Sequence, residues 1–354
     1  METIKRFLNQ PAEWLKSTGP LSDIVMSSRV RLARNIGGFA FSSRLAAKQH
    51  REIIRLVETA VQDSSMLKNA IFLRSADLDE VDRQFLLERH LISREHAMED
   101  GENAVAISLN EIVSLMVLEE DHLRLQAFQS GFNLIEAWRI VDKIDDDIEK
   151  GVSYAFSPNL GYLTACPTNV GTGLRASCML HLPGLVLTKQ APKILQALSK
   201  LNLAVRGLYG EGTQATGNLF QFSNQITLGQ HEDEIIENLE CVIRKVVEHE
   251  KDARQYLAEK KKIKFEDQVW RALGALKSAR SIASEEATQL ISLVLLGIHM
   301  GVLASKITAT EVNSLLLLVQ PAHLQRMNQK VLNAAERDLK RAELIRERLK
   351  KVEV

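Results

Sequence analysis

The apolar residues of this 354-residue chain change their spacing near residue 232, and this change constrains the possible folds more than any other feature. Upstream of it, apolar residues alternate or run together over lengths typical of β-strands. These segments lie at residues 104–109, 122–128, 162–166, 203–208 and 219–227. A helical repeat at Ile53, Val57, Ala60 and Val61 interrupts them. We therefore expect a mixed region of strands and helices before residue 232.

Downstream of residue 232 the apolar spacing is helical almost throughout. Thr308 and Glu311 have the spacing of a capping box at the start of one helix. Further helical stripes lie at residues 235–247, 265–279, 285–303, 311–318 and 335–352. We expect an α+β protein in which an antiparallel sheet flanked by helices, residues 1–250, precedes an all-α C-terminal domain, residues 251–354.

The charge balance excludes some classes of partner. Lys and Arg number 45 and so do Asp and Glu, so no overall basic field attracts nucleic acid or an anionic membrane. The longest apolar stretch, residues 290–304, is shorter than the roughly 20 residues of a membrane span. The N-terminus lacks the apolar core of a secretory signal. We expect a cytoplasmic protein with no membrane segment and no direct nucleic-acid partner.

The three cysteines form no CxxC pair, so the sequence supports neither a disulfide scaffold nor a zinc site, and no metal ligands are predicted. Cys178 and Cys241 are interpreted as small buried apolar residues. Cys166 has different neighbours, because a Pro-Thr-Asn turn and the glycines at 171 and 173 follow it. A cysteine at a strand end, beside backbone N–H groups and a predicted helix start, is favoured as a thiolate.

Arginines in strand-like or turn contexts suggest a polyphosphate site, although the chain contains no P-loop, no protein-kinase motif set and no HExxH. On a strand, Arg29 and Arg31 would share one face while Val30 pointed to the other. Taken alone, this spacing favours a solvated strand face with ordinary ion pairs. The other arginine segments are residues 121–124, 173–177 and 205–207.

Three adjacent carboxylates, Glu119, Glu120 and Asp121, directly follow the apolar residues 112–118. A carboxylate held at such a position could accept a proton or grip a guanidinium group. Taken alone, the pattern favours a charged turn between two elements.

Four ordered segments closely resemble the catalytic domain of the phosphagen (guanidino) kinases. They are Ser-Ser-Arg-Val-Arg-Leu-Ala-Arg-Asn, Glu-Glu-Asp-His-Leu-Arg, Cys-Pro-Thr-Asn-Val-Gly-Thr and Val-Arg-Gly-Leu-Tyr-Gly-Glu. The resemblance covers roughly residues 20 to 250 and implies an antiparallel sheet flanked by helices. It also implies transfer of the γ-phosphoryl group of ATP to a guanidinium nitrogen.

By motif position, the resemblance implies a set of nucleotide contacts. The five arginines in this set would stabilise a loose phosphoryl-transfer transition state by surrounding its oxygens with cations. Mg²⁺ would be held mainly by the nucleotide phosphates and water. The implied residues are Ser27, Ser28, Arg29, Val30, Arg31, His90, Arg124, Arg175, Ala176, Ser177, Cys178, Met179, Arg206, Gly207, Leu208, Tyr209, Gly210 and Glu211.

The resemblance also assigns the acceptor half of the reaction. An arginine guanidinium has a pKa above about 12 and is a poor nucleophile until it loses a proton. Glu120 would orient it and accept that proton, and Glu211 would be the second carboxylate on the same group. Cys166, as a thiolate, would add negative charge beside a guanidinium nitrogen.

The sequence departs from the phosphagen kinases at three places, and the first of these departures favours a protein arginine over free arginine as the substrate. Only 26 residues precede Ser27, where those kinases carry a helical domain that covers a small substrate. Leu118 stands where an Asn often precedes the paired glutamates. A helical C-terminal extension contains Arg337, Asp338 and Arg341 in an RDxxRA segment. From spacing alone, that segment reads as a solvated amphipathic face.

The whole arrangement resembles the bacterial protein-arginine kinases, the McsB family. In that family the RDxxRA segment forms a phosphoarginine pocket, which implies that Asp338 holds the guanidinium and that Arg337 and Arg341 hold the phosphate. The resemblance implies allosteric regulation by the product, a stress-response role and a homodimer. It also implies protein substrates with accessible arginines, including misfolded proteins and a heat-shock repressor, a zinc-containing activator protein, and a Clp ATPase and protease acting downstream.

Two other functions remain open. A small-molecule guanidino kinase would phosphorylate free arginine. A non-catalytic adaptor would bind phosphoarginine through Arg337, Asp338 and Arg341 without turnover.

Overall fold

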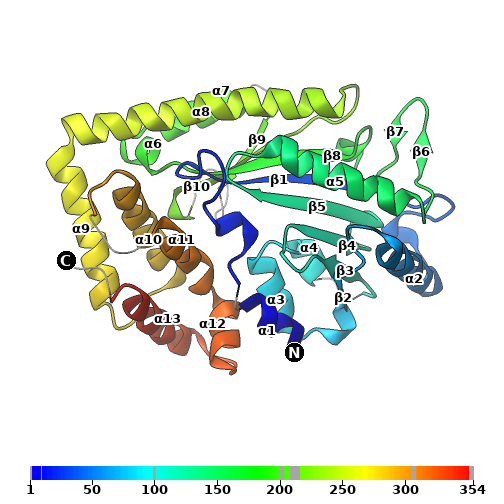
Figure 1. Ribbon diagram of the computed structural model, residues 1–354, viewed down its shortest axis with the longest axis horizontal. Coiled ribbons are helices and arrows are strands. Elements are labelled where there is room, and N and C mark those ends of the chain that lie inside the picture. Colours follow the sequence, from blue (N-terminus) through cyan, green and yellow to red (C-terminus); the bar gives the residue numbers. More distant parts are fainter. Residues whose placement is uncertain are drawn as a thin grey trace.

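The computed structural model describes residues 2–8, 10–98, 101–199, 203–207, 216–303 and 308–350. Within these residues, an eight-stranded sheet forms the centre of the first part of the chain (Figure 1). The strand order is β2-β3-β4-β5-β1-β8-β10-β9, and all neighbouring strands run antiparallel. The antiparallel sheet predicted from the sequence is confirmed.

The longest strand of this sheet, β1, pairs with β5 on one side and with β8 on the other. A separate two-stranded hairpin projects beyond the sheet (Figure 1). The bounds of the sheet strands are Val25–Arg34 (β1), Ile71–Arg74 (β2), Ala104–Ile107 (β3), Val113–Val117 (β4), Leu123–Ser130 (β5), Leu174–His181 (β8), Leu203–Gly207 (β9) and Leu219–Asn224 (β10), and the hairpin consists of Phe156–Ser157 (β6) and Gly161–Tyr162 (β7).

Helices surround the sheet and form most of the chain after residue 232. None of the described helices is long and apolar enough to cross a membrane. Their bounds are Glu2–Leu8 (α1), Ala47–Asp63 (α2), Glu80–Glu88 (α3), Arg94–Met98 (α4), Leu134–Glu149 (α5), Pro183–Leu187 (α6), Ala191–Ser199 (α7), Glu232–Lys260 (α8), Lys262–Ser278 (α9), Ser284–His299 (α10), Ala309–Leu318 (α11), Pro321–Asn328 (α12) and Ala334–Arg348 (α13), and short 3-10 turns lie at Glu13–Leu15 (η1), Ser42–Arg44 (η2), Ser75–Asp77 (η3), Pro167–Asn169 (η4) and Thr216–Asn218 (η5).

Helices α5 and α8 cover one face of the sheet and leave the other face available for a site (Figure 1). In α5 the buried apolar residues recur every three or four positions, so a single stripe faces the strands. Burying each of its Leu, Val and Ile side chains contributes about 1.5–3 kcal/mol relative to leaving it in water. The stripe consists of Leu134, Ala137, Val141, Ile144 and Ile148.

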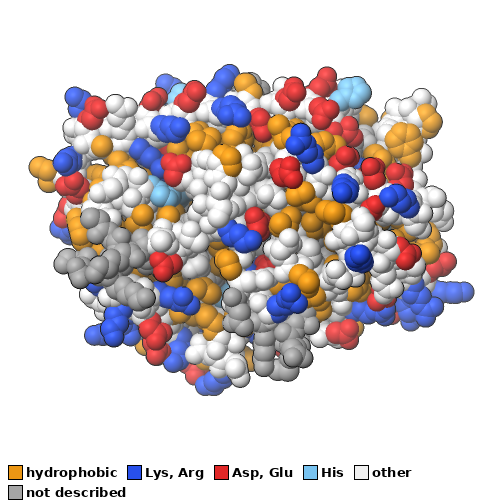
Figure 2. Space-filling model, viewed as in Figure 1, with side chains coloured by type: hydrophobic (Ala, Val, Ile, Leu, Met, Phe, Trp, Pro, Cys, Tyr) orange, Lys and Arg blue, Asp and Glu red, His pale blue; other side chains and the backbone are white. Residues whose placement is uncertain are grey.

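A second core lies among α9, α10, α11 and α13. The long helix α8 belongs to both cores, since Ile235 to Ala253 pack with the sheet and Leu257 packs with the helical region. The domain boundary predicted at residue 250 therefore falls inside one continuous helix. Charged residues of both signs are interspersed over the face of the molecule shown in Figure 2, consistent with the neutral net charge.

The chain near Cys166 differs from the sequence expectation. Residues 162–166 do not form a strand, because the β6–β7 hairpin ends at Tyr162. A single 3-10 turn, Pro167–Asn169, follows Cys166, and the next element is β8 rather than a helix. Gly171 and Gly173 lead into that strand with φ values of +110° and +65°, a backbone region that favours glycine.

Two predictions of buried apolar residues are also corrected. Cys241 is exposed on α8, although Cys178 is buried as expected. In α13, Ala335 and Leu339 face solvent, whereas Ala342 and Ile345 of the same stripe are buried as expected and Arg341 is buried beside them. The apolar spacing was misleading at the first two positions because a charged side chain occupies part of the buried face. Val352, the last member of the predicted stripe, lies outside the described residues.

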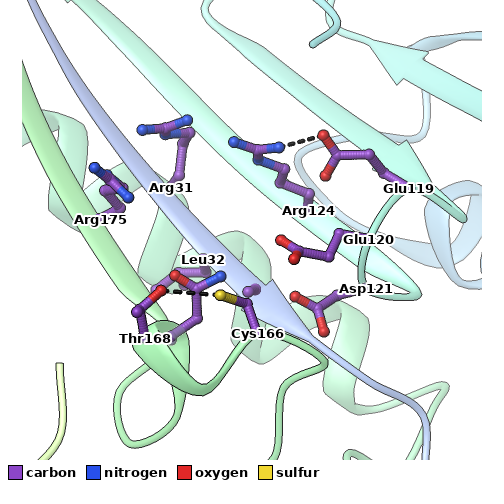
Figure 3. Close-up of a pocket in the computed structure, with 12 residues that line it drawn as sticks. Arg31, Leu32, Glu119, Glu120, Asp121, Arg124, Cys166, Thr168 and Arg175 are labelled. Atoms are coloured by element: carbon purple, nitrogen blue, oxygen red, sulfur yellow. Dashed lines mark hydrogen bonds and ion pairs between the residues drawn. The ribbon is translucent and has the colours of Figure 1, made fainter. Parts of the chain in front are cut away.

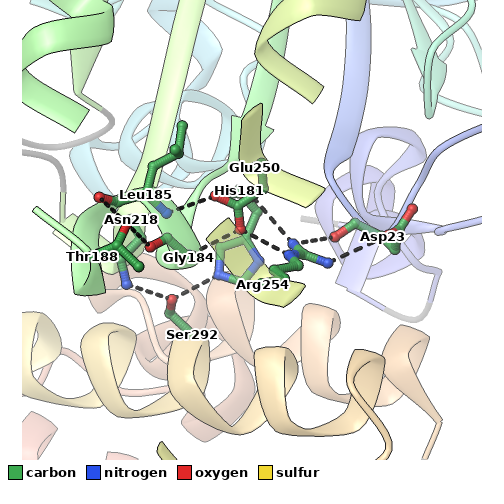
Figure 4. Close-up of polar contacts among 9 residues, drawn as sticks. All are labelled: Asp23, His181, Gly184, Leu185, Thr188, Asn218, Glu250, Arg254 and Ser292. Carbon is green, nitrogen blue, oxygen red and sulfur yellow. Dashed lines mark hydrogen bonds and ion pairs between the residues drawn. The ribbon is translucent and has the colours of Figure 1, made fainter. Parts of the chain in front are cut away.

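A buried polar network connects the sheet to the helical region (Figure 4). Glu250 on α8 accepts hydrogen bonds from the backbone N–H groups of Gly184 and Leu185, each at 2.9 Å, and from Arg254 Nε at 2.8 Å. Arg254 also donates to the carbonyl oxygen of Asp23 at 3.0 Å. A second branch joins His181 Nε2 to the Ser292 hydroxyl of α10 at 2.7 Å. Because the network is buried, its charges depend on one another for compensation.

We predict that Glu250→Ala lowers the free energy of unfolding by about 3–5 kcal/mol, because it leaves Arg254 buried without its main carboxylate partner. Urea denaturation followed by circular dichroism measures the change. The matched control is Asp267→Ala, which breaks the exposed i,i+4 pair with Arg271 and should cost less than about 1 kcal/mol. Equal losses in the two variants would contradict a structural role for the network.

Candidate active site

Five arginines from four strands lie on the sheet face opposite α5 and α8. Alternate residues of a strand share a face, so Arg29 and Arg31 of β1 point the same way, as predicted. The strand register places Arg175 of β8 directly beside Arg31, and Arg124 of β5 beside Ala33. Arg206 of β9 lines the same cleft from the sheet edge.

The same alternation turns four of the predicted nucleotide-contacting side chains away from this face. Val30, Ala176 and Cys178 belong to the core beneath α5 and α8. Ser28 is also buried there, where its hydroxyl donates to the carbonyl oxygen of Gly131 at 2.9 Å. These four side chains line neither the large cleft above the arginines nor the hollow that contains Glu120 and Cys166, both of which are described below.

The cleft above the arginines has a volume of about 800 Å³. Its far wall comes from α3, α4 and the residues between them, which include His90 and Ser93. A smaller hollow beside Arg29 is lined by Ser27, Ser177 and Met179. Most of the predicted nucleotide-contacting side chains therefore converge on one region, with Gly207 at its rim. Leu208, Tyr209, Gly210 and Glu211 lie outside the described residues.

Most of the cations on this face have no carboxylate partner. Of the five arginines, only Arg124 forms an ion pair within the described chain, and its partner is Glu119. Burial, followed by the charges of Arg124 and Arg175, lowers the pKa of Arg29 to about 9. Burial and the neighbouring arginines also hold the pKa of Arg31 well below its usual value.

Guanidinium groups retain their proton in proteins, so these pKa shifts indicate positive charge that lacks a counter-charge. The buried Nε atoms of Arg31 and Arg175 have no hydrogen-bond acceptor within the described chain. Arg29 makes only neutral contacts, since its Nη2 donates to Gln221 at 2.9 Å and its guanidinium lies over the Phe128 ring at 5.3 Å. Such a face is suited to a polyanion that arrives with its own acceptors.

His90 lies at the edge of this face in an unusual conformation. It follows the end of α3 with a φ of +61°, in the left-handed region that is costly for a residue with a β-carbon. Its ring meets that of Trp14 edge-on at 4.9 Å. Burial and the nearby charge of Arg29 lower the pKa of His90 to about 3, so its ring is neutral.

At one end of the cleft, the three adjacent carboxylates have three different environments (Figure 3). Glu119 is buried and pairs with Arg124 and the Ser93 hydroxyl. Asp121 is buried and accepts hydrogen bonds from Asn35 Nδ2 and the Ala165 N–H, both at 2.6 Å. Glu120 is exposed and lines the open space. Leu118, at the start of this turn, has a φ of +60°.

Glu120 and Cys166 come from different loops and face a common hollow of about 120 Å³ (Figure 3). Burial and the charges of Asp121 and Glu119 raise the pKa of Glu120. A raised carboxyl pKa makes the ionised form a stronger base. The Cys166 sulfur lies 3.0 Å from the Thr168 hydroxyl. This hollow opens onto the cleft, because Arg31, Glu120 and Arg124 line both.

Several contributing residues were given no role by the sequence analysis. Asn35 lies at the end of the first quoted motif, and its side chain connects Asp121 to the Leu163 carbonyl and to the backbone of His122. Gln221 and Trp14 likewise contact Arg29 and His90 only because the sheet brings distant segments together. No group of three or more potential metal-ligating side chains occurs among the described residues.

The predicted phosphoarginine segment lies on α13. Arg341 is buried there, and it donates from Nε to the Val319 carbonyl at 2.7 Å and from Nη1 to the Ile282 carbonyl at 2.8 Å. Asp338 accepts a further bond from Arg341, and Arg337 donates to the Leu332 carbonyl at 2.8 Å. The solvated face that spacing alone favours does not describe Arg341, which is buried and joins three parts of the helical region.

Comparisons with known proteins match both halves of the chain. Residues 52–253 match the family described as ATP:guanido phosphotransferase, C-terminal catalytic domain, and residues 262–354 match the protein-arginine kinase McsB C-terminal domain. The protein-arginine kinase of Symbiobacterium thermophilum is 49% identical over 96% of each chain. That of Brevibacillus brevis is 46% identical over 99% of this chain and 98% of the relative.

Solved structures show the same catalytic fold. The duplicated taurocyamine kinase from Schistosoma mansoni, with bound transition state analog components, aligns with a TM-score of 0.60 at 26% identity. The alignment covers 66% of this chain, which spans about a third (34%) of that duplicated protein. Lombricine kinase aligns with a TM-score of 0.56 at 26% identity, over 70% of this chain and 72% of the other.

We predict that tripolyphosphate raises the melting temperature, because it supplies the counter-charge that the arginine face lacks. At 100 times its Kd, a ligand that binds only the folded state stabilises it by about 2.7 kcal/mol. Arg31→Met should reduce this shift while leaving the ligand-free protein at least as stable as wild type, because an uncompensated cation is removed. The control Arg139→Met removes a cation from the exposed surface of α5 and should retain the full shift. An undiminished shift in Arg31→Met, measured by differential scanning calorimetry, would contradict the assignment.

Proposed function

The chain belongs to the protein-arginine kinase family, and from this membership we propose which residues carry out its phosphoryl transfer and what the transfer serves. The reaction moves the γ-phosphoryl group of ATP to the guanidinium group of an arginine side chain in a protein. One observation carries the residue assignment: arginines that have few counter-charges among the described residues lie beside a hollow that an exposed carboxylate and a thiol both line.

The arginine face supports binding of the ATP phosphates. Arg29, Arg31 and Arg175 project from adjacent strands, so their spacing is set by backbone hydrogen bonds rather than by flexible loops. A loose phosphoryl-transfer transition state is stabilised mainly by cations already placed around its oxygens. Arg124 differs because Glu119 fixes its orientation. Arg206, exposed at the sheet edge, would reach the nucleotide from the outer side.

The hollow at the end of that face supports binding of the acceptor. Glu120 has no side-chain partner among the described residues, and its raised pKa suits it to accept the guanidinium proton. Cys166, as a thiolate, would place a second negative charge against the same planar group. Glu119 and Asp121 take other roles, since both are already paired. The role of Glu211 stays a prediction.

Mg²⁺ accompanies ATP in this proposal. The described residues contain no metal-ligating cluster, which fits an ion held mainly by phosphate oxygens and water. When bound, Mg²⁺ neutralises charge on the β- and γ-phosphates. The protein's own part is to hold the phosphates with Arg29, Arg31 and Arg175 and to orient the acceptor with Glu120.

The proposal also covers the biological role of the reaction and its protein partners. Phosphorylated arginines would mark misfolded proteins for a Clp ATPase and protease and would relieve repression by a heat-shock repressor. A zinc-containing activator protein and a second copy of the chain are the proposed partners. Phosphoarginine would act as an allosteric signal at Arg337, Asp338 and Arg341. The present bonds of Arg341 to Val319, Ile282 and Asp338 use its Nε and Nη1 atoms, so Nη2 would be its donor to the ligand.

Two alternatives remain to be separated from this proposal. A kinase acting on free arginine would use the same arginine face and the same Glu120. A phosphoarginine-binding adaptor without turnover would need only the α13 segment. Among the described residues, Glu120 is exposed and has no side-chain partner, and most of the nearby arginines have no ion pair, which favours an active enzyme.

We predict that the protein, mixed with Mg-ATP, forms an acid-labile P–N bond on a folded protein substrate that carries one accessible arginine. A variant of that substrate with lysine in place of the arginine should remain unmodified. Phosphorus NMR detects the product, and free arginine serves as the competing substrate. Transfer to free arginine alone would favour the small-molecule kinase, whereas phosphoarginine binding without transfer to any substrate would favour the adaptor.

The same assay tests the role of the thiol. Cys166→Ser should lower kcat by roughly tenfold or more, about 1.4 kcal/mol of barrier, because serine does not supply the negative charge. Its melting temperature should remain unchanged, since Cys166 lies at the edge of an open hollow. The control is Cys241→Ser, at an exposed position on α8. Full activity in Cys166→Ser would remove the thiol from the mechanism.

A further inference from the structure

Helix α12 of the C-terminal region lies against α3, whose end forms a wall of the cleft, and polar contacts join both ends of the pair (Figure 1). At one end, Arg326 of α12 pairs with Asp79 and Asp82 at the start of α3. At the other end, Glu88 in the last turn of α3 meets the start of α12. The two helices are therefore antiparallel and held at two separate points.

The contact at Glu88 is buried and fully formed. One carboxylate oxygen accepts the N–H of Ala322 at 2.8 Å, and the other accepts the N–H of His323 at 3.1 Å and its ring Nδ1 at 2.7 Å. The His323 ring also stacks on Phe85 of α3, with 4.3 Å between ring centroids. A carboxylate that satisfies the first N–H groups of a helix and also pairs with a side chain makes a strong, directional link.

Arg89, the next residue, is held equally firmly. Its guanidinium makes two bonds to Glu111, at 2.7 and 2.8 Å, and a third to the Gln10 carbonyl at 3.0 Å. Its remaining nitrogen, Nη1, lies 3.4 Å from His323 Nε2. The His323 ring therefore contacts Glu88 through one nitrogen and Arg89 through the other, and it joins the two residues that precede His90.

His90 emerges from this fixed pair into the cleft. Its carbonyl oxygen accepts a hydrogen bond from Gln126 at 2.8 Å, and Gln126 is the register partner of Arg31. Its left-handed conformation is costly and persists only where the surrounding structure holds it. The surroundings that hold it are Glu88 and Arg89 on one side and Gln126 on the other.

We propose that Glu88, Arg89 and His323 are positioning residues that place His90 against the nucleotide, so that the C-terminal helical region sets nucleotide affinity through α12. This inference rests on the proposed function, in which the cleft beside His90 holds ATP. Glu88, Arg89 and His323 line neither the cleft nor the hollow that contains Glu120 and Cys166. In this proposal they therefore affect the nucleotide through His90. The link continues to α13, because Arg341 donates to the carbonyl of Val319, two residues before α12 begins.

The test replaces the polar atoms of His323 and keeps its ring. His323→Phe preserves the stacking on Phe85 but removes both nitrogens that face Glu88 and Arg89. We expect KM for Mg-ATP to rise by about tenfold, the size of one lost hydrogen bond to a charged group, with little change in kcat. His323→Gln, which can still donate to Glu88, should recover most of the affinity.

The matched control is Arg326→Met, which breaks the other end of the same helix pair. If the α3–α12 contact only stabilised the fold, both variants would lower the melting temperature and neither would change KM. If the contact positions His90, KM for Mg-ATP should rise in His323→Phe and stay unchanged in Arg326→Met. An equal KM in both variants and wild type would overturn the inference.

A second readout is independent of turnover. The ring of Trp14 contacts that of His90. In a background variant with Trp138 and Trp270 replaced by Phe, Trp14 is the only tryptophan, so its fluorescence reports on the surroundings of His90. In the ligand-free protein, His323→Phe should shift Trp14 emission and Arg326→Met should not. An unshifted spectrum in His323→Phe would contradict the inference. Failure of the proposed function would appear separately, as absence of transfer in the wild-type protein.

Discussion

Mutual repulsion among the arginines on one sheet face is the constraint on which the rest of the structure depends. Arg29, Arg31 and Arg175 stand on adjacent strands, and no carboxylate among the described residues forms an ion pair with them. Flexible side chains on loops would move apart, whereas β1 is fixed by a ladder of hydrogen bonds to β5 and β8 on its two sides. The apolar stripe of α5 and the first part of α8 then support the opposite face. The sheet therefore holds charges close together so that a bound anion completes the arrangement.

The loop with the three carboxylates at one end of the cleft shows how neighbouring residues of one chemical type can have separate roles. Glu119 orients Arg124, and Asp121 fixes the loop that carries Ala165 and Cys166. Glu119 and Asp121 already have partners, so Glu120 is the one of these three carboxylates that is available to a ligand. The positive φ of Leu118 starts the turn that arranges them in this way, at a conformational cost for a branched side chain. Local strain here serves to separate three carboxylates that are adjacent in the sequence.

The sequence predicted the parts of this site that depend on short-range rules. Alternation along a strand placed Arg29 and Arg31 on one face. Glu120 and Cys166 were assigned through the resemblance to the phosphagen kinases, and the structure places both at one hollow. The same alternation, carried through β8, would also have excluded the side chains of Ala176 and Cys178, but a helix was expected there. From spacing alone, Arg341 belonged to a solvated face, because residues 336–353 alternate in charge. Only the fold shows that backbone carbonyls of Val319 and Ile282 accept its hydrogen bonds.

The strand order also determines when the arginine face can exist during synthesis. β1 carries Arg29 and Arg31, but its two neighbours begin at residues 123 and 174. Until β8 has left the ribosome, the first two arginines lack the partner that brings a third cation beside them. Pairings so distant in sequence form late and slowly. The nascent chain therefore carries separated, solvated cations for much of its synthesis, and it acquires a surface of concentrated positive charge only when the sheet closes.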